Sequence, residues 1–354
     1  MEVKSRRLLF ILAEVLLLVL TACSAGNPNR PTLGPIQNTP AESPFSTSTP
    51  MPTYTPTPAP LGSAENPLVM AVLNANPDAT QTAALNTLTQ DLSTALHQTM
   101  IGKFYPDYFS LELALQNKEA HYAWLQPVEY LLASQKQLLT VQLVSNHLGV
   151  DAYGIQFLGN RDSNFTSYYD PSNNTSTANS DVALAQLAGL RGCFTSDTSL
   201  AGYWLPQGYL TRSNIQTQKP IQTFSYSASL RALYIKGICD FAVTYAISAD
   251  PRTSSAVIND LQDVIQRLPI IWISPAVIPN LSLSVSPQVD LPTQVTINAY
   301  LQDFARTEPG KQLISSILNY ETSALDPLPD SAYEQLRELL ALQDIRLADL
   351  VAKP

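Results

Sequence analysis

The sequence predicts an α/β protein with two lobes, each a mostly parallel sheet flanked by helices. From about Asn66 onward, apolar runs typical of strands alternate with segments of helical spacing, and the pattern restarts after the polar stretch Ser163 to Ser180. Alternating strands and helices are typical of parallel sheets covered on both faces. A length of 354 residues allows about two domains. A ligand cleft is then expected at the carboxyl ends of the strands.

The composition excludes some classes of protein. Hydrophobic residues make up 45% of the chain, which is enough for a large core and excludes global disorder. A formal net charge of −9 and a pI near 4.8 argue against binding to nucleic acid, because phosphate neutralisation needs clustered Lys and Arg.

The first half of the folded region is expected to begin with a strand buried on both faces, the continuous apolar run Leu68 to Leu73. Apolar residues at helical spacing predict a helix from Thr80 to Met100. The remaining elements of this half are, in order, a short strand around Phe104, a helix capped by Asp107, a strand at 120–125, a helix beginning at Pro127, and a strand at 152–158.

The second half repeats the alternation after the loop at 163–180. The predicted elements are, in order, a helix at 181–188 that stops at Gly189, a strand at 190–195, a helix at 199–211, a helix at 227–236 closed by Gly237, a strand at 238–245, a helix at 254–268, a strand at 270–273, a short strand at 281–285, and mainly helices to the end.

The N-terminus has the features of a targeting segment. Lys4, Arg6 and Arg7 precede the apolar stretch Leu8 to Leu20, which is shorter than a spanning helix requires. The tetrapeptide Leu20-Thr21-Ala22-Cys23 resembles a bacterial lipobox, in which cleavage leaves a lipidated cysteine. Residues 1–22 are therefore predicted to be a lipoprotein signal peptide and Cys23 a lipidation site. The alternative is an ordinary signal peptide in which this cysteine is incidental.

Residues 23–65 are predicted to form a Pro- and Thr-rich disordered tether that starts at the lipidated cysteine. Too few large apolar residues are present for folding, and the prolines favour an extended polyproline II conformation. At ~3 Å per residue, such a tether reaches up to roughly 100 Å from a membrane. A Pro-rich recognition peptide is the alternative interpretation.

Four segments resemble the motifs of one protein family and occur in the same order as they do in that family. They are LELALQNKEAHYAWLQPVEY at 111–130, LAGLRGCFTSDTSLAGY at 187–203, KGICDFAVTY at 236–245 and WISPAVIPN at 272–280. All are similar to phosphate-, phosphite- and phosphonate-type solute-binding proteins of ABC transporters. The resemblance implies a two-lobed periplasmic-binding-protein fold of type II, with the ligand cleft between the lobes. It places lobe 1 at 66–157, lobe 2 at 158–273, and the return to lobe 1 with the C-terminal helices at 274–354.

The resemblance implies a binding protein and no enzyme. The expected protein captures a small oxyanion or organic ligand for an ABC permease, as a monomer without metal, cofactor or nucleic acid. The lipobox would anchor it to the outer face of the cytoplasmic membrane. No HExxH, GxSxG, CxxC, Walker-type or GxGxxG motif occurs in the sequence. The alternatives are an anchored sensing or partner-binding module of the same fold and an anchored enzyme with a non-local site.

The resemblance also implies two walls of a ligand site. In this family a helix start receives the oxyanion with hydroxyl and backbone N–H groups, which suits the partial positive charge of a helix N-terminus. The wall in lobe 2 is predicted to comprise Ser196, Thr198, Ser199, Ala201, Gly202, Tyr203, Ser227 and Tyr245. The opposing wall is predicted to comprise Tyr105, Gln126 and Tyr130.

This chain departs from the family pattern where the ligand is expected. Leu200 and Ala201 replace two hydroxyl residues, and Ser227 stands where a His is usual. Each lost hydrogen bond to a charged ligand removes roughly 1.5–3 kcal/mol, which disfavours a fully ionised phosphonate. A monoanion, or a more apolar ligand contacted by Trp204 and several tyrosines, is the alternative. The hydroxyls could also act only as helix caps, and the tyrosines as ordinary core residues.

Cys193 and Cys239 are the two cysteines that remain once Cys23 is lipidated. They occupy matching early positions of two predicted strands that are neighbours in a 2-1-3 strand order. Export to an oxidising compartment permits a disulfide, closing a loop of about 46 residues. A disulfide is therefore predicted, with two buried free thiols as the alternative.

Overall fold

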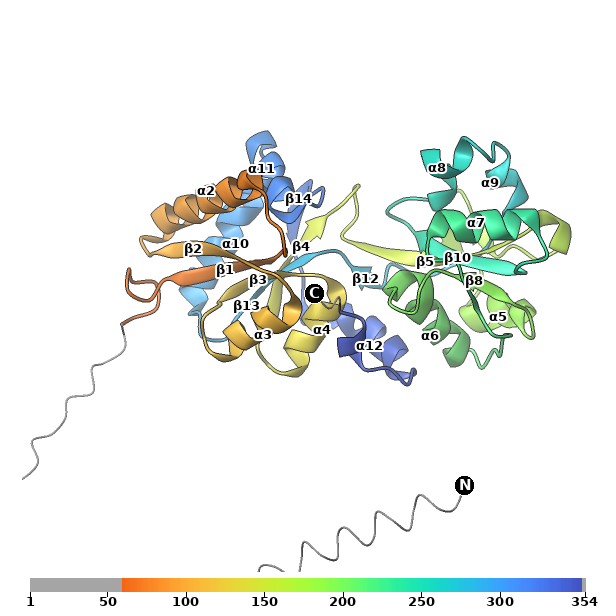
Figure 1. The fold of residues 1–354 in the computed structure, drawn as a ribbon, viewed down its shortest axis with the longest axis horizontal. Helices are drawn as coiled ribbons and strands as arrows, with labels where there is room; N and C mark the ends of the chain where they lie inside the picture. Colours follow the sequence, from red (N-terminus) through yellow and green to blue (C-terminus); the bar gives the residue numbers. More distant parts are fainter. Residues whose placement is uncertain (1–58, 352–354) are drawn as a thin grey trace, which may run out of the picture. The chain divides into compact units, whose positions relative to one another are not determined.

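Two mixed sheets organise residues 59–351, the part of the chain that this computed structural model describes (Figure 1). The predicted signal peptide, the lipidation site at Cys23 and nearly all of the tether lie outside the described residues. Within residues 59–351, no helix has the length and apolar character needed to cross a bilayer.

The first sheet has six strands in the order β14-β4-β13-β3-β1-β2. Its strands are β1 (Leu68–Leu73), β2 (Met100–Tyr105), β3 (Tyr122–Leu125), β4 (Thr140–Asn146), β13 (Ser282–Val285) and β14 (Ala324–Pro327). β1 pairs in parallel with both β2 and β3, so these three strands end at the same edge of the sheet. β13 runs antiparallel to β3 and ends at the opposite edge.

Helices cover both faces of the first sheet and complete the first lobe. They are α2 (Ala79–Leu96), α3 (Tyr108–Gln116), α4 (Pro127–Gln135), α10 (Leu291–Ala305) and α11 (Glu308–Leu318). Leu88 of α2, Ile297 of α10 and Ile314 of α11 belong to one buried core cluster, whereas Leu111 of α3 and Leu131 of α4 belong to another. α2, α3 and α4 each follow a parallel strand directly, so their N-termini lie at one edge.

The second sheet has the order β11-β5-β10-β8-β9 and forms the second lobe with its helices. Its strands are β5 (Ala152–Gly159), β8 (Gly192–Phe194), β9 (Ile221–Gln222), β10 (Phe241–Ala246) and β11 (Ile270–Ile273). Its helices are α5 (Ser180–Leu184), α6 (Leu205–Arg212) with a preceding π-helical turn (Leu200–Trp204), α7 (Tyr226–Ile235), α8 (Ser255–Ile258) and α9 (Val264–Arg267). β8 is parallel to both β9 and β10.

The C-terminal helix α12 (Glu334–Ala341) contacts both lobes. Just before it, the Tyr333 hydroxyl donates to Ser282 Oγ of β13 at 3.0 Å. On its other side, Leu339 packs closely against Gly208 of α6. A Cβ atom added to Gly208 would lie only 2.8 Å from the Leu339 carbonyl oxygen. The chain also crosses between the lobes through β12 (Ile278–Pro279), which pairs with β5. α12 and β12 therefore connect the two lobes.

Several predicted elements differ from the structure. The helix expected at 80–100 ends at Leu96, because His97 adopts a left-handed conformation, and Met100 instead opens β2. The helix expected at 254–268 is broken into α8 and α9. The whole of β5 belongs to the second sheet, although residues up to 157 were expected in the first lobe. β4 and β14 were not expected from the sequence. β14 lacks a clear strand pattern, whereas the alternation of Leu139, Val141 and Leu143 with polar residues could have indicated β4.

The loop expected at 163–180 contains a short hairpin of β6 (Tyr169–Asp170) and β7 (Thr175–Ser176).

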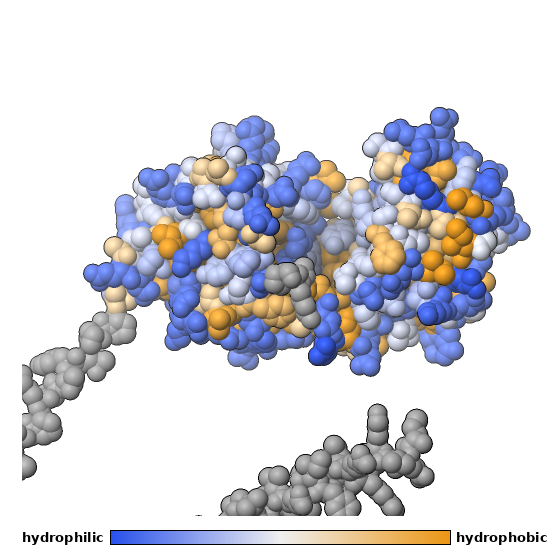
Figure 2. Space-filling model, in the orientation of Figure 1, coloured by the Kyte–Doolittle hydropathy of each residue, from blue (hydrophilic) through white to orange (hydrophobic). Residues whose placement is uncertain are grey.

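The surface is hydrophilic over most of the face in Figure 2, and hydrophobic residues gather near α7. Ile235 and Ile238, at the carboxyl end of that helix, are 69% and 42% exposed. This apolar area therefore lies at the end of α7 away from its N-terminus.

A disulfide joins Cys193 and Cys239, with their Cα atoms 5.7 Å apart. Cys193 lies in β8 opposite Ala242 of β10, and Cys239 lies two residues before β10 begins. The bond therefore connects two adjacent parallel strands beneath the helices of the second lobe.

Replacing both cysteines by Ser is expected to lower the free energy of unfolding by roughly 4 kcal/mol, because the unfolded chain loses a closed loop of 46 residues. Urea denaturation of the unreduced protein measures this loss, and reduced wild type serves as the control that should match the variant. Two thiols that react with an alkylating agent after denaturation without reductant would contradict the disulfide.

Candidate functional site

Two helix N-termini converge at one edge of the second sheet. The segments that follow β8 and β9 run side by side: Thr223 N–H donates to the Phe194 carbonyl at 2.8 Å, and Phe224 N–H donates to the Thr195 carbonyl at 3.3 Å. These segments lead into the turn that begins α6 and into α7, respectively. Because β8 and β9 are parallel, both helix starts lie at the carboxyl ends of their strands, where open α/β sheets bind ligands.

Each of these helix starts is capped by a neutral hydroxyl. Ser199 Oγ accepts the Gly202 N–H at 3.0 Å, and Ser225 Oγ accepts the Ala228 N–H at 3.1 Å. Two N–H groups follow each cap: those of Leu200 and Ala201 after Ser199, and those of Tyr226 and Ser227 after Ser225. Within residues 59–351, none of these four groups donates a hydrogen bond. Free first-turn N–H groups together with the helix dipole form an anion site.

Tyrosines surround the two helix starts. The ring of Tyr226 packs edge-on against Tyr245 of β10, with centroids 5.0 Å apart. Burial raises the pKa of the Tyr226 phenol, an effect that the nearby Ser199 side chain partly offsets. Tyr203 packs against Phe194 with centroids 5.6 Å apart and remains half-buried. The predicted residues Ser199, Tyr203 and Tyr245 are therefore brought together.

Sequence reasoning missed Ser225 and Tyr226, because it began the helix at Ser227. A Ser directly before a helical pattern is a cap signal, and Ser225 could have been found on that basis. Tyr226 carries no comparable signal. Its position follows from the pairing of β8 with β10, which brings α7 close to Tyr245.

Gly202 has a packing role that differs from the predicted close approach of a ligand. A Cβ at this position would lie against Thr195, 2.9 Å from its Cβ, and 2.8 Å from Ser199 Oγ. Gly202 and the neighbouring Ala201 are both buried. The absence of a side chain at Gly202 therefore allows the helix start to pack against the end of β8. For Ala201, the backbone N–H is the group available to a ligand.

Ser196 and Thr198 lie just before this helix start and bond to each other, with their hydroxyl oxygens 2.8 Å apart. Neither of them caps the helix. Thr198 instead lines a cavity of about 490 Å³ together with Asp197, Trp204 and residues of the C-terminal segment, Asp344, Ile345, Arg346, Asp349 and Leu350. The approach of this C-terminal segment to the loop had no signal in the sequence.

In the first lobe, Tyr105 is the last residue of β2 and Gln126 directly follows β3, so both lie at the edge that bears the helix N-termini. Tyr105 is half-buried, and its carbonyl accepts the Asn74 N–H at 2.9 Å. Gln126 is exposed at the start of α4. Both positions therefore remain available to a ligand.

Tyr130 does not line this wall. It is 1% exposed, its hydroxyl donates to Asp330 Oδ1, and its ring packs against Tyr333 with centroids 4.4 Å apart. The reason is its place in the second turn of α4, where it faces the segment that leads into α12. Tyr130 is a core residue that fixes the C-terminal helix to the first lobe.

Glu129 closes the N-terminus of α4. Its Oε2 accepts the Gln126 N–H at 2.7 Å, so the carboxylate lies over the positive end of its own helix. Burial raises the pKa of Glu129 to about 7, although that hydrogen bond acts in the opposite direction. Sequence reasoning did not select this residue.

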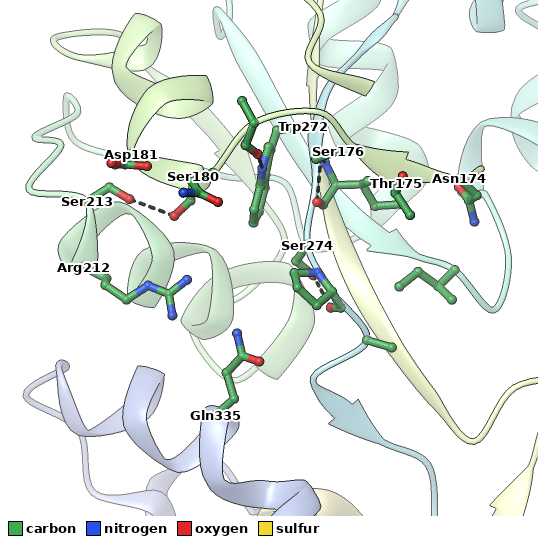
Figure 3. Close-up of a pocket in the computed structure, with 16 residues that line it drawn as sticks. Asn174, Thr175, Ser176, Ser180, Asp181, Arg212, Ser213, Trp272, Ser274 and Gln335 are labelled. Carbon is green, nitrogen blue, oxygen red and sulfur yellow. Dashed lines mark hydrogen bonds between the residues drawn. The ribbon is translucent and has the colours of Figure 1, made fainter. Parts of the chain in front are cut away.

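A larger cavity of about 740 Å³ lies elsewhere, between the hairpin β6–β7, α5, the end of α6 and α12 (Figure 3). None of the predicted site residues lines it. Its serine hydroxyls already have partners: Ser213 donates to Ser180 at 3.1 Å and Ser176 to the Ile273 carbonyl at 2.9 Å. Within residues 59–351, no cluster of three or more His, Cys, Asp or Glu could hold a metal ion.

A family model described as "ABC transporter, phosphonate, periplasmic substrate-binding protein" matches residues 70–333. This chain belongs to that family. It is therefore an extracytoplasmic solute-binding protein of the kind that serves ABC transporters, as the four sequence segments predicted. No curated relative matches the sequence.

Solved structures show the same two-lobed fold of type II periplasmic binding proteins. XAC2383 from Xanthomonas citri, solved bound to chloride ion and bound to ATP, is 15% identical with a TM-score of 0.54 in both forms. The matches cover 80% of this chain and 98% and 97% of those chains. Transferrin 1 from Manduca sexta is 13% identical with a TM-score of 0.50, over 78% of this chain and 46% of its own. The predicted fold class is confirmed.

Glu129→Gln is expected to raise stability at pH 8 and to have less effect as the pH falls. A carboxyl whose pKa rises from 4.5 to about 7 on folding binds an extra proton in the folded state between these values, so stability falls as pH rises through that range. The variant should therefore be more stable than wild type by up to roughly 3 kcal/mol at pH 8. Urea denaturation from pH 4 to pH 8 measures this difference, and a difference that does not change with pH would contradict the assignment.

Proposed function

We propose that this protein captures a small oxyanion of the phosphonate class at the converging starts of α6 and α7 and presents it to an ABC permease. The observation that carries the proposal is the set of four free N–H groups at two adjacent helix N-termini, each capped by a neutral serine. Tyr226, Tyr245 and Tyr203 add phenols and apolar ring surface beside them.

The departures from the family pattern are compatible with this function. Replacing a hydroxyl side chain at Leu200 or Ala201 leaves the backbone N–H in place, so the helix start keeps its donors. The loss of side-chain donors weakens binding by roughly 1.5–3 kcal/mol per hydrogen bond, which favours an anion held mainly by backbone groups. An apolar substituent on that anion would lie against the tyrosine rings.

Ligand binding favours a closed arrangement of the lobes. An anion held by the second lobe reaches the first lobe at Tyr105 and Gln126, which lie at the carboxyl edge of its parallel strands. A ligand that contacts both lobes stabilises the closed form over the open form, and a permease can distinguish the two.

Ser227→Asp is expected to weaken binding of methylphosphonate by at least about 100-fold, because a carboxylate at the start of α7 repels the anion. The substitution is compatible with folding, since an acidic residue suits a helix N-terminus. Leu291→Asp, at the exposed start of α10 on the other edge of the first sheet, is the matched control and should bind within twofold of wild type. Calorimetric titration measures both, and unchanged binding by Ser227→Asp would refute this site.

We further propose that Cys23 carries the lipid that anchors the protein to the outer face of the cytoplasmic membrane, with the Pro- and Thr-rich stretch up to about Pro60 as a spacer. The tether was expected to reach residue 65, but residues 61–65 pack on the first lobe, where the Gly62 carbonyl accepts the Thr99 N–H at 2.7 Å and Leu61 contacts the core. The support is the lipobox-like sequence Leu20-Thr21-Ala22-Cys23 followed by the Pro- and Thr-rich stretch. Two acyl chains give stable anchoring, whereas one does not.

Metabolic labelling with a fatty-acid analogue is expected to mark the wild-type protein in the membrane fraction and to leave Cys23→Ala unlabelled. Ser24→Ala is the control and should be labelled normally. Equal labelling of wild type and Cys23→Ala would contradict the lipidation.

A further inference from the structure

The cavity of about 740 Å³ beside Trp272 has no part in the proposed function (Figure 3). Its walls come from the hairpin β6–β7, the segment that leads into α5, the end of α6, the crossover from β11 to β12, and Gln335 of α12. A volume in this range accommodates a small organic molecule and exceeds what a bare ion fills. The cavity therefore has the dimensions of a second binding site.

Arg212, the last residue of α6, supplies a cation to this cavity. Its Cζ lies 4.7 Å from the centroid of the Tyr209 ring, and this cation–π contact orients the side chain. In Figure 3 its guanidinium group and the amide of Gln335 point toward the same space. Within residues 59–351, Arg212 forms no ion pair. An oriented guanidinium group is therefore left for an anion from solution.

The neutral polar groups of the lining differ in what they leave for a ligand. The serine hydroxyls already bond to protein acceptors. Asn174 accepts the Tyr169 hydroxyl through Oδ1 at 2.9 Å, which leaves the two N–H donors of its amide. Asn179 precedes α5, and its side chain does not cap that helix. The groups that remain are therefore mainly donors, which suit a ligand with acceptor oxygens.

The charges and the apolar lining indicate the class of this ligand. Among the described residues that line the cavity, Arg212 is the only cation and Asp181 the only carboxylate. This balance favours a monoanion over a dianion, because a second negative charge would find no second cation. The planar guanidinium group matches a carboxylate with two parallel hydrogen bonds. Ile247, Pro275 and Ala276 offer apolar surface to the rest of such a molecule.

We propose that this cavity is a second binding site, for a small organic monocarboxylate whose carboxylate pairs with Arg212 and whose apolar body lies against Pro275 and Ala276. The site is separate from the starts of α6 and α7, because none of the four residues whose N–H groups are proposed to hold the oxyanion lines the cavity. The crossover and α12 connect the two lobes, so the bound molecule touches the parts that join them. The inference goes beyond the proposed function and does not depend on it.

Benzoate and its neutral analogue benzamide test the inference, titrated into the protein at pH 7 and followed by ligand-observed NMR. Wild type should bind benzoate with a dissociation constant of about 1 mM or lower, at least about tenfold more tightly than benzamide. An excess of methylphosphonate, about 10 mM, should leave benzoate binding unchanged, because the two anions occupy different sites.

Variants of the two charged lining residues locate the site. Arg212→Gln should weaken benzoate binding at least about tenfold, and Arg212→Lys should recover part of this loss, because it keeps the charge without the paired hydrogen bonds. Asp181→Asn should bind benzoate about twofold more tightly, since a like charge is removed. Arg191→Gln is the matched control: Arg191 is an exposed arginine of the second lobe that does not line the cavity, and its variant should bind like wild type. Thermal denaturation checks that each variant is folded.

The outcomes separate this inference from the proposed function. If benzoate does not bind, or binds no more tightly than benzamide, the monocarboxylate site is wrong while the oxyanion site stands. Displacement of benzoate by methylphosphonate would place both in one site and overturn the inference, as would a folded Arg212→Gln variant with unchanged affinity for benzoate. If benzoate binds as expected and methylphosphonate does not bind at all, the proposed function fails and the second site stands.

Discussion

The ligand edge of each lobe depends on one constraint, the unpaired N–H groups at the start of every helix. Parallel strands deliver successive helices with their N-termini at the same edge, so these groups accumulate there and must be satisfied. In both lobes a cap accepts one first-turn N–H of the helix that it precedes: Asp78 and Asp107 do so for α2 and α3, and Ser199 and Ser225 do so for the starts of α6 and α7. The caps of α2 and α3 are carboxylates, whereas those at the starts of α6 and α7 are neutral and leave the positive end of the helix to a ligand.

The rest of the fold holds these two edges in place. The disulfide between Cys193 and Cys239 fixes β8 next to β10, and this pairing brings the start of α6 close to Tyr245. Tyr130 and Tyr333 pack together beneath α12, which in turn contacts α6. Residues that look like ligand contacts in the sequence, such as Tyr130 and Gly202, instead serve this support.

The family and the fold class could be predicted from the sequence because periodicity and segment order survive where individual site residues change. The helix starts at Asp107 and Pro127 were also predictable, since capping is a local property. The roles of Tyr130 and Glu129 were not, because they depend on burial by α12 and neighbouring helices far away in sequence. Ser225, Tyr226 and the C-terminal segment near Thr198 likewise become site neighbours only through strand pairing and packing.

A crystal structure of the protein with ethylphosphonate will show whether the oxyanion binds to the backbone at the starts of α6 and α7. We expect the phosphonate oxygens within hydrogen-bond distance of the N–H groups of Ala201 and Ser227, with the ethyl group directed toward the first lobe. A phosphonate in the cavity beside Trp272 and Arg212, with these N–H groups unoccupied, would contradict it.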